Sequence, residues 1–210
     1  MVRRIDLEAP STWTGVVEEV ATVLRRGDVV VLPAEGLYGY HVRADDPEAL
    51  AALRRVKPRE EGRGWIVLLA ERTPRHHAGS PPDLWRSSLP PAADALARAH
   101  WPGALTLVVP APRGALPDLA AQDGSIALRS PGSAFLQSVL IATGSPLVST
   151  SANRPGEPPP SRLEECQLEG VALAVDGGPL SGLPSTVVRV DGSTVEVLRS
   201  GALKVEGEAP

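Results

Sequence analysis

The chain contains very few cysteine, lysine and aromatic residues. Its 210 residues include one cysteine, Cys166, so no disulfide can form within the chain and nothing points to an oxidising compartment. No stretch is apolar for long enough to cross a bilayer, and residues 1–6 lack the apolar run of a signal peptide. We therefore expect a cytoplasmic protein with no membrane insertion.

An excess of basic charge is also missing. The formal net charge is -4 at pH 7, whereas a protein that coats nucleic acid needs a basic surface to displace counterions. Any contact with RNA must therefore be local. Lysine occurs only at Lys57 and Lys204, and every other basic residue is arginine. A lysine supplies a compact point charge rather than a planar fork, so each of the two is informative.

The pattern of apolar residues predicts an α/β fold. The length fits one domain over residues 1–210, with no additional C-terminal domain. Helices are expected from Ser11 to Leu24, from Asp46 to Val56 and over residues 135–141. Strands are expected over residues 28–32, 66–69, 105–109, 126–128, 147–149 and 171–175, with a hairpin of 186–190 and 194–198 around Asp191-Gly192. This alternation with a terminal hairpin predicts a mixed sheet, and proline clusters over 80–91 and 155–160 predict loops.

A cluster of basic residues follows the second expected helix. It comprises Arg54, Arg55, Lys57, Arg59 and Arg63. Two cations separated by one residue in an extended segment point to the same side and can bind one phosphate or carboxylate together. The segment alone favours a solvated run of charge at a helix end. The rarity of lysine in this chain favours a phosphate site instead.

A polar segment, Ser149-Thr150-Ser151-Ala152-Asn153, follows an expected strand directly. Strand ends are where ligands bind in α/β sheets, and hydroxyl and amide groups there offer hydrogen bonds to a nucleotide or a polar substrate. The same residues in isolation favour an Asx-type turn. Neither this segment nor the basic cluster identifies an enzyme alone.

Several segments in order carry a resemblance to a known family. They are residues 33–39 (PAEGLYG), 57–59 (KPR), 101–106 (WPGALT), 129–131 (RSP), 149–153 (STSAN), 185–187 (STV) and 198–201 (LRSG). With these motifs the chain resembles the YrdC-like (YrdC/YciO) family of threonylcarbamoyl-AMP synthases. The resemblance spans about residues 28–201, and the ordered pairing of lysine-x-arginine with serine-x-asparagine is highly specific.

The resemblance implies a twisted mixed sheet flanked by helices, with a large, positively lined concave cleft. It also implies a nucleotidyltransferase that joins L-threonine, bicarbonate or CO2 and ATP into threonylcarbamoyl-AMP and releases pyrophosphate. ATP would be a substrate, with Mg2+, and no organic cofactor would be tightly bound. A TsaD-type tRNA threonylcarbamoyl transferase would use the product, and contact with tRNA or double-stranded RNA is implied as well.

The same resemblance implies roles for individual residues. Lys57 and Arg59 would be catalytic. The residues implied for ATP binding are Lys57, Arg59, Arg63, Ser125, Ser151, Asn153 and Arg199. Those implied for the amino acid are Gly36, Arg129, Ser149 and Ser185, with Arg129 pairing with the carboxylate. No protein metal site is implied.

The chain departs from the family pattern on the amino-acid side. Ala34 and Gly36 replace threonines, Leu68 replaces a histidine, and Gly64-Trp65 replaces the usual proline-leucine pair. Loss of the hydroxyl and imidazole groups would make the pocket roomier near Gly36 and more apolar near Leu68, and Trp65 could refill space. The alternatives are therefore a relative that uses another amine, and a non-catalytic module that binds nucleotide or RNA. Carbamoyl-adenylate handling, which usually occurs in longer chains, is a third.

Two histidines and the single cysteine do not indicate a functional site. His76 and His77 are adjacent in an expected loop without other ligands at metal-binding spacing. Cys166 lies in a charged stretch without a basic neighbour that would lower its pKa. We expect neither a metal site nor a nucleophilic cysteine.

Overall fold

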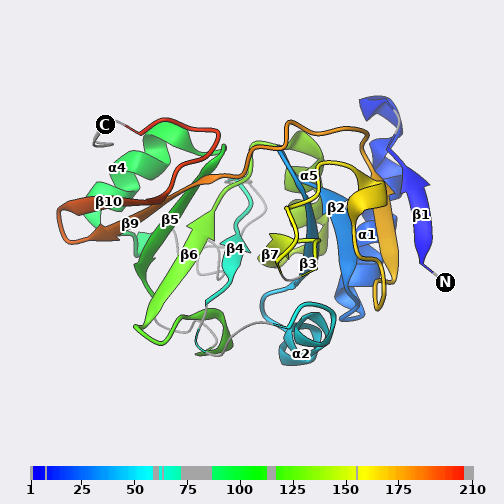
Figure 1. The fold of residues 1–210 in the computed structure, drawn as a ribbon, viewed down its shortest axis with the longest axis horizontal. Helices are drawn as coiled ribbons and strands as arrows, with labels where there is room; N and C mark the ends of the chain where they lie inside the picture. Colours follow the sequence, from blue (N-terminus) through cyan, green and yellow to red (C-terminus); the bar gives the residue numbers. More distant parts are fainter. Residues whose placement is uncertain are drawn as a thin grey trace.

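A computed structural model describes residues 2–7, 9–58, 62, 64–71, 87–112, 117–154 and 156–205. Within these ranges ten strands form one sheet in the order β1-β8-β2-β3-β7-β4-β6-β5-β9-β10 (Figure 1). The strands are β1 (Arg3–Asp6), β2 (Val30–Pro33), β3 (Tyr38–Arg43), β4 (Ile66–Leu68), β5 (Leu105–Pro110), β6 (Ser125–Arg129), β7 (Leu147–Ser151), β8 (Leu173–Asp176), β9 (Thr186–Asp191) and β10 (Thr194–Arg199). Parallel and antiparallel pairs both occur, for example β4 with β6 and β3 with β7, so the predicted mixed α/β sheet is confirmed.

Helices cover both faces of this sheet. The α-helices are α1 (Trp13–Arg25), α2 (Pro47–Val56), α4 (Pro91–His100) and α5 (Ala134–Thr143), and short 3-10 helices are η1 (Pro10–Thr12), η2 (Pro117–Leu119) and η3 (Leu163–Glu165). Apolar residues of α1 and α5 pack with Val30 and Leu32 in one core cluster. Those of α2 and α4 pack with Val29 and Val31 in the other. Because successive strand residues face opposite ways, β2 contributes to both cores.

Local sequence explains where two of these helices begin and end. The Asp46 carboxylate accepts hydrogen bonds from the backbone N–H groups of Glu48 and Ala49, and α2 ends before Lys57. The Ser133 hydroxyl caps α5 in the same way, accepting from the backbone N–H of Leu136. Gly144 then ends α5 with a φ of 72°, a left-handed conformation that suits glycine.

The structure also contains elements that the sequence did not predict. Strands β1 and β3 and helix α4 were missed, although the other expected helices and strands lie within a few residues of their predicted bounds. The expected loop over residues 80–91 lies mostly outside the described residues, as do His76 and His77. None of the described helices is both long and apolar enough to span a membrane.

A long connection crosses the molecule from β8 to β9. These strands hold the second and ninth positions of the sheet, and residues 177–185 join them (Figure 1). The Tyr38 hydroxyl anchors the start of this crossing segment, residues 177–185. It lies 2.7 Å from the Gly178 carbonyl oxygen and accepts a 2.9 Å hydrogen bond from the Gly177 N–H. The Gly182 N–H also donates to the Gly36 carbonyl, so the crossing segment is fastened at the start of β3.

Candidate functional site

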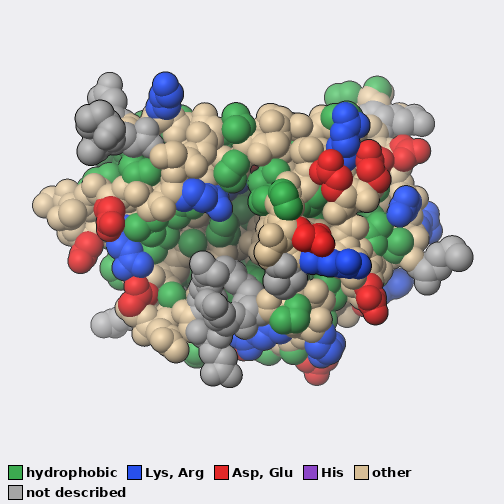
Figure 2. Space-filling model, in the orientation of Figure 1, with side chains coloured by type: hydrophobic (Ala, Val, Ile, Leu, Met, Phe, Trp, Pro, Cys, Tyr) green, Lys and Arg blue, Asp and Glu red, His purple; other side chains and the backbone are tan. Residues whose placement is uncertain are grey.

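A cleft of about 630 Å³ lies over the central strands. The charged and polar side chains that line it are Glu35, Tyr38, Lys57, Arg129, Ser149, Thr150, Ser151, Asn153, Ser181, Ser185 and Arg199. They come from β3, β6, β7 and β10, the connection between β2 and β3, the end of α2, the loop after β7 and the crossing segment. On the face shown in Figure 2, acidic and basic side chains are interspersed, with no broad positive patch.

Lys57 and Asn153 meet at one side of this cleft. The Lys57 ammonium donates a 3.0 Å hydrogen bond to the side-chain oxygen of Asn153 and another to its backbone carbonyl. The Asn153 amide nitrogen in turn donates to the carbonyl oxygens of Arg154 and Glu157, at 3.0 and 2.6 Å. Lys57 is 9% exposed and Asn153 8% exposed. The end of α2 is therefore fastened to the loop that follows β7.

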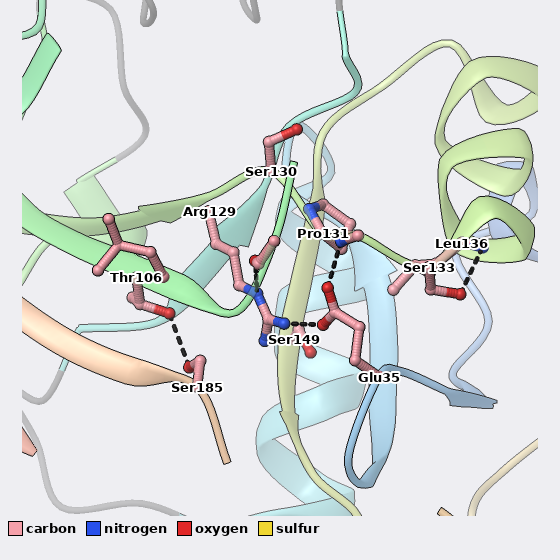
Figure 3. A network of polar contacts seen from close by, with 12 residues as sticks. Glu35, Thr106, Arg129, Ser130, Pro131, Ser133, Leu136, Ser149 and Ser185 are labelled. Carbon is pink, nitrogen blue, oxygen red and sulfur yellow. Dashed lines mark hydrogen bonds and ion pairs between the residues drawn. The ribbon is translucent and has the colours of Figure 1, made fainter. Parts of the chain in front are cut away.

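Arg129 and Glu35 form an ion pair on the other side. Arg129 Nη2 contacts Glu35 Oε2, and Arg129 Nε donates a 3.0 Å hydrogen bond to the Gly103 carbonyl (Figure 3). Glu35 Oε1 accepts from the backbone N–H of Gly132. Together these contacts hold the guanidinium of Arg129 in one orientation at the end of β6.

A second arginine, Arg199, is held by the backbone of the crossing segment. Its Nη2 donates to the Ser185 carbonyl at 2.8 Å and to the Ser185 hydroxyl at 3.2 Å. The Ser185 hydroxyl lies 2.9 Å from that of Thr106 on β5 (Figure 3). Thr106 is completely buried, so the position of Ser185 is set by the core below it.

The two arginines make the cleft favourable for anions. Burial and the charge of Arg199 lower the pKa of Arg129 to about 10, and burial also lowers the pKa of Arg199. Both shifts reflect the cost of holding positive charge away from water. An anionic ligand would relieve that cost, and with Lys57 the cleft has three cations against the single carboxylate of Glu35.

Ser149 lies on β7, directly opposite His41 on β3. The His41 Nε2 atom is 3.2 Å from the Ser149 hydroxyl oxygen. His41 is completely buried, and this burial lowers its pKa to about 4, so the ring is neutral at pH 7. Ser149 itself is partly exposed and lines the cleft.

The structure corrects three expectations about the amino-acid side. A Cβ atom on Gly36 would lie 1.9 Å from the Leu183 carbonyl oxygen, so backbone of the crossing segment occupies the space and the pocket is not roomier there. Leu68 does not line the cleft, because it packs in the core under α1 and α5. Trp65 is buried in the opposite core and does not refill the pocket. The apolar residues that line the cleft include Leu37, Ile66 and Leu183.

Eight of the residues implied by the resemblance line this one cleft. They are Gly36, Lys57, Arg129, Ser149, Ser151, Asn153, Ser185 and Arg199. Ser125 does not, because it begins β6 whereas Arg129 ends it, and its hydroxyl donates a 2.6 Å hydrogen bond to Asp123. Arg59 and Arg63 lie outside the described residues.

Three participants were not found from the sequence. Glu35 and Thr106 were visible only as members of motifs, and His41 gave no signal; their partners, Arg129, Ser185 and Ser149, are distant in the chain. Within the described ranges no group of three or more His, Cys, Asp or Glu side chains could hold a metal ion. Burial and the neighbouring carboxylates of Glu165 and Glu164 raise the pKa of Cys166 to about 12, which disfavours a reactive thiolate.

A family model for Sua5, YciO and YrdC proteins, described as telomere recombination, matches residues 22–201. The chain belongs to the Sua5/YciO/YrdC family. A relative from Vibrio parahaemolyticus, named threonylcarbamoyl-AMP synthase, is 33% identical over 186 residues, which is 88% of this chain and 98% of the relative.

Solved structures of the Sua5/YciO/YrdC family share the fold. P. abyssi Sua5 complexed with L-threonine has a TM-score of 0.81 at 24% identity, over 97% of this chain and 58% of Sua5. E. coli YciO has a TM-score of 0.81 at 21% identity, over 98% of both chains. This chain thus spans little more than half of that Sua5, and a single domain over residues 1–210 without a further C-terminal domain stays a prediction.

Proposed function

We propose that the protein is an L-threonylcarbamoyladenylate synthase, which forms threonylcarbamoyl-AMP from L-threonine, bicarbonate or CO2 and ATP. The observation that carries this proposal is the convergence of Lys57, the Ser151–Asn153 segment, Arg129 and Arg199 on one cleft. Support also comes from relatives named threonylcarbamoyl-AMP synthase, including the 33% identical one from Vibrio parahaemolyticus. The family uses ATP as a substrate.

The proposed reaction requires positioning and charge neutralisation rather than a protein nucleophile. An oxygen of the threonine carbamate attacks the α-phosphorus of ATP, and the bond between that phosphorus and the bridging oxygen of pyrophosphate breaks. Both reactants are anions, so cations that lie between them lower the barrier. Lys57, already held by Asn153, supplies a charge that needs little reorganisation on binding.

The two sides of the cleft would take the two parts of the product. Lys57, Ser151, Asn153 and Arg199 would face the nucleotide, and Arg59 and Arg63 stay predictions for the same role. On the other side, Arg129 would bind the carboxylate of threonine, with Ser149 and Ser185 as neighbours and Gly36 at the pocket wall. The contacts of Arg129 with Glu35 and Gly103 leave Nη1 available for that carboxylate among the hydrogen bonds described.

Mg2+ would enter as part of the nucleotide substrate. The one carboxylate among the cleft residues, Glu35, is already paired with Arg129 and Gly132. Mg2+ in nucleotide sites is often held largely by phosphate oxygens and water. These residues therefore fit a metal that arrives on ATP better than a metal held by the protein alone.

The product would pass to a TsaD-type transferase that modifies tRNA. Threonylcarbamoyl-AMP is a mixed anhydride, which an acceptor amine of tRNA can attack to release AMP. Direct contact with tRNA or double-stranded RNA and a cytoplasmic location stay predictions.

The deciding experiment is formation of pyrophosphate and threonylcarbamoyl-AMP from ATP, bicarbonate and an amino acid, followed by mass spectrometry. Threonine, serine, valine and alanine should be compared at equal concentration. Product with a clear preference for threonine supports the proposal. Product with another amine, and none with threonine, would show that the catalysis persists but that its amine differs.

One observation favours the second candidate function, synthesis from another amine. The Leu183 backbone occupies the place where a side chain at position 36 would project, so backbone atoms form the wall of the amino-acid pocket there. If no amine yields pyrophosphate while ATP still binds and Lys57→Ala abolishes that binding, the protein is a nucleotide-binding module. Dependence on carbamoyl phosphate would instead indicate carbamoyl-adenylate chemistry.

A further inference from the structure

His41 and Ser149 form a polar pair between the buried part of the sheet and the cleft. A fully buried histidine side chain on β3 contacts a hydroxyl on β7 that opens into the cleft. We propose that His41 is a positioning residue. It accepts a hydrogen bond from the Ser149 hydroxyl, so that the Ser149 oxygen can accept one from the N–H of the substrate amine. This inference rests on the proposed function, because it assumes that an amine substrate binds beside Ser149.

The geometry restricts how the Ser149 hydroxyl can behave. Its oxygen is 3.2 Å from His41 Nε2, so a neutral ring either accepts the hydroxyl proton at Nε2 or donates its own proton from Nε2. The two tautomers have opposite consequences for the cleft. When Nε2 accepts, the Ser149 oxygen directs lone pairs at the substrate, whereas when Nε2 donates, Ser149 directs a proton there.

The surroundings of the ring favour the first arrangement. The backbone of Gly39 interacts favourably with a protonated ring, although Nδ1 makes no hydrogen bond of standard geometry. A backbone carbonyl can only accept, so the favourable contact with Gly39 places the proton of the neutral ring on Nδ1. Ser149 then serves as the donor in its contact with His41.

The amine substrate needs a hydrogen-bond acceptor for its N–H groups. An amino-acid amine and its carbamate both carry N–H groups, and a buried N–H without a partner costs free energy. On this side of the cleft the Glu35 carboxylate is already engaged with Arg129 and Gly132, and the Ser185 hydroxyl with Thr106 and Arg199. Among the contacts described, the Ser149 hydroxyl meets only the buried His41, so its oxygen can accept from the substrate.

The tautomer can be measured on the free protein without any substrate. In a long-range 1H–15N correlation spectrum of the 15N-labelled protein, His41→Leu assigns the His41 signals by their loss. We expect His41 to carry its proton on Nδ1, and Ser149→Ala to shift the Nε2 resonance while the other histidines stay unchanged. A proton on Nε2 would overturn the proposal, because Ser149 would then be the acceptor of that bond. This result does not depend on whether the proposed enzymatic function is correct.

Kinetics tests the consequence for the amine. We expect His41→Leu to raise the KM for threonine roughly tenfold with the KM for ATP unchanged, as for the loss of one hydrogen bond. His41→Gln, whose side-chain oxygen can accept near the Nε2 position, should restore part of this loss. In a Ser149→Ala background, His41→Leu should have no further effect.

The matched control is Val42→Ala, which disturbs the same strand on the opposite face, where Val42 pairs with Val148. This variant should lose stability and keep the KM for threonine. An equal KM change in Val42→Ala, or additive effects of His41→Leu and Ser149→Ala, would overturn the proposal. If the unaltered protein makes no product while the tautomer is as expected, the proposed function fails and the His41–Ser149 arrangement stands.

Discussion

The ammonium group of Lys57 and the side-chain oxygen of Asn153 lie 3.0 Å apart, although 96 positions separate the two residues in the chain. Asn153 also accepts from Lys57 through its backbone carbonyl. The lysine that stands out by its rarity and the polar end of β7 therefore belong to one site. Lys57 lines the cleft while Asn153 holds its ammonium group in place.

Replacement of Lys57 should weaken ATP binding without unfolding the protein. We expect Lys57→Ala to lower ATP affinity at least tenfold, because a phosphate loses a nearly desolvated cation. Lys57→Arg should not restore it, since a planar guanidinium does not fit a buried site shaped for a point charge. Isothermal titration with ATP measures both. The control is Lys204→Ala, which removes the other, exposed lysine, and an equal loss there would contradict the assignment.

Gly36 should tolerate no side chain. A Cβ atom would overlap the Leu183 carbonyl oxygen, so Gly36→Ala must displace the crossing segment. We expect a loss of about 1–3 kcal/mol in unfolding free energy, as for other overpacked sites, and a higher KM for the amino acid. Urea unfolding and kinetics check these effects.

The matched control for this change is Gly15→Ala in α1. A Cβ at Gly15 meets nothing within 4 Å, so this variant should be stabilised by up to about 1 kcal/mol through helix propensity. If Gly36→Ala behaves like Gly15→Ala, the contact with Leu183 is not a constraint.

The carboxylate of Glu35 should orient Arg129. We expect Glu35→Gln to reduce stability by about 1–3 kcal/mol, because a mostly buried guanidinium loses its counter-charge while some exposure to water limits the cost. The KM for threonine should rise, since the neutral amide holds the Arg129 guanidinium less firmly than the carboxylate does. Glu18→Gln, which breaks the exposed pair with Arg25, should leave both properties nearly unchanged. A fall in the threonine KM would instead show that Glu35 competes with the substrate carboxylate.

Burial of His41 should make the protein less stable in mild acid. The pKa of His41 is lowered from 6.5 to about 4, so between these values the unfolded chain binds a proton that the folded protein does not. Stability is therefore unaffected above pH 6.5 and falls as the pH drops toward 4, by at most about 1.4 kcal/mol per pH unit. The measurement is urea unfolding at pH 7 and pH 5.

His41→Leu removes this titration and isolates its contribution. The difference in unfolding free energy between pH 7 and pH 5 should be smaller in the variant than in the unaltered protein. Equal differences would show that His41 does not stay neutral in the fold.

Local signals in the sequence account for much of the fold. Helix α2 is predictable because Asp46, Pro47 and the apolar stripe that follows all favour it. Strand β3 is not, because Gly39 and His41 break any apolar pattern and the strand becomes buried only between β2 and β7. Helix α4 was missed because it begins at Pro91, in a region that reads as a proline-rich loop, and buries only two alanines.

The site shows the same division between local and long-range information. Eight of the residues that the motifs indicated line one cleft. The motifs misplaced Leu68 and Trp65. Leu68 shares a face of β4 with the cleft residue Ile66 but packs under α1 and α5, and Trp65 packs in the opposite core. The contact of Gly36 with Leu183 joins residues that only the folded chain brings together.

The crossing segment has a further consequence for how the molecule can move. It joins strands near opposite ends of the sheet and rests on Gly36 and Tyr38 at the mouth of the cleft. A hinge motion that separated the two halves of the sheet would have to break the contacts of this segment with Gly36 and Tyr38. Release of the adenylate would then be coupled to bending of the whole sheet. A ligand that fills the cleft would also reduce the motion of strands that do not contact it.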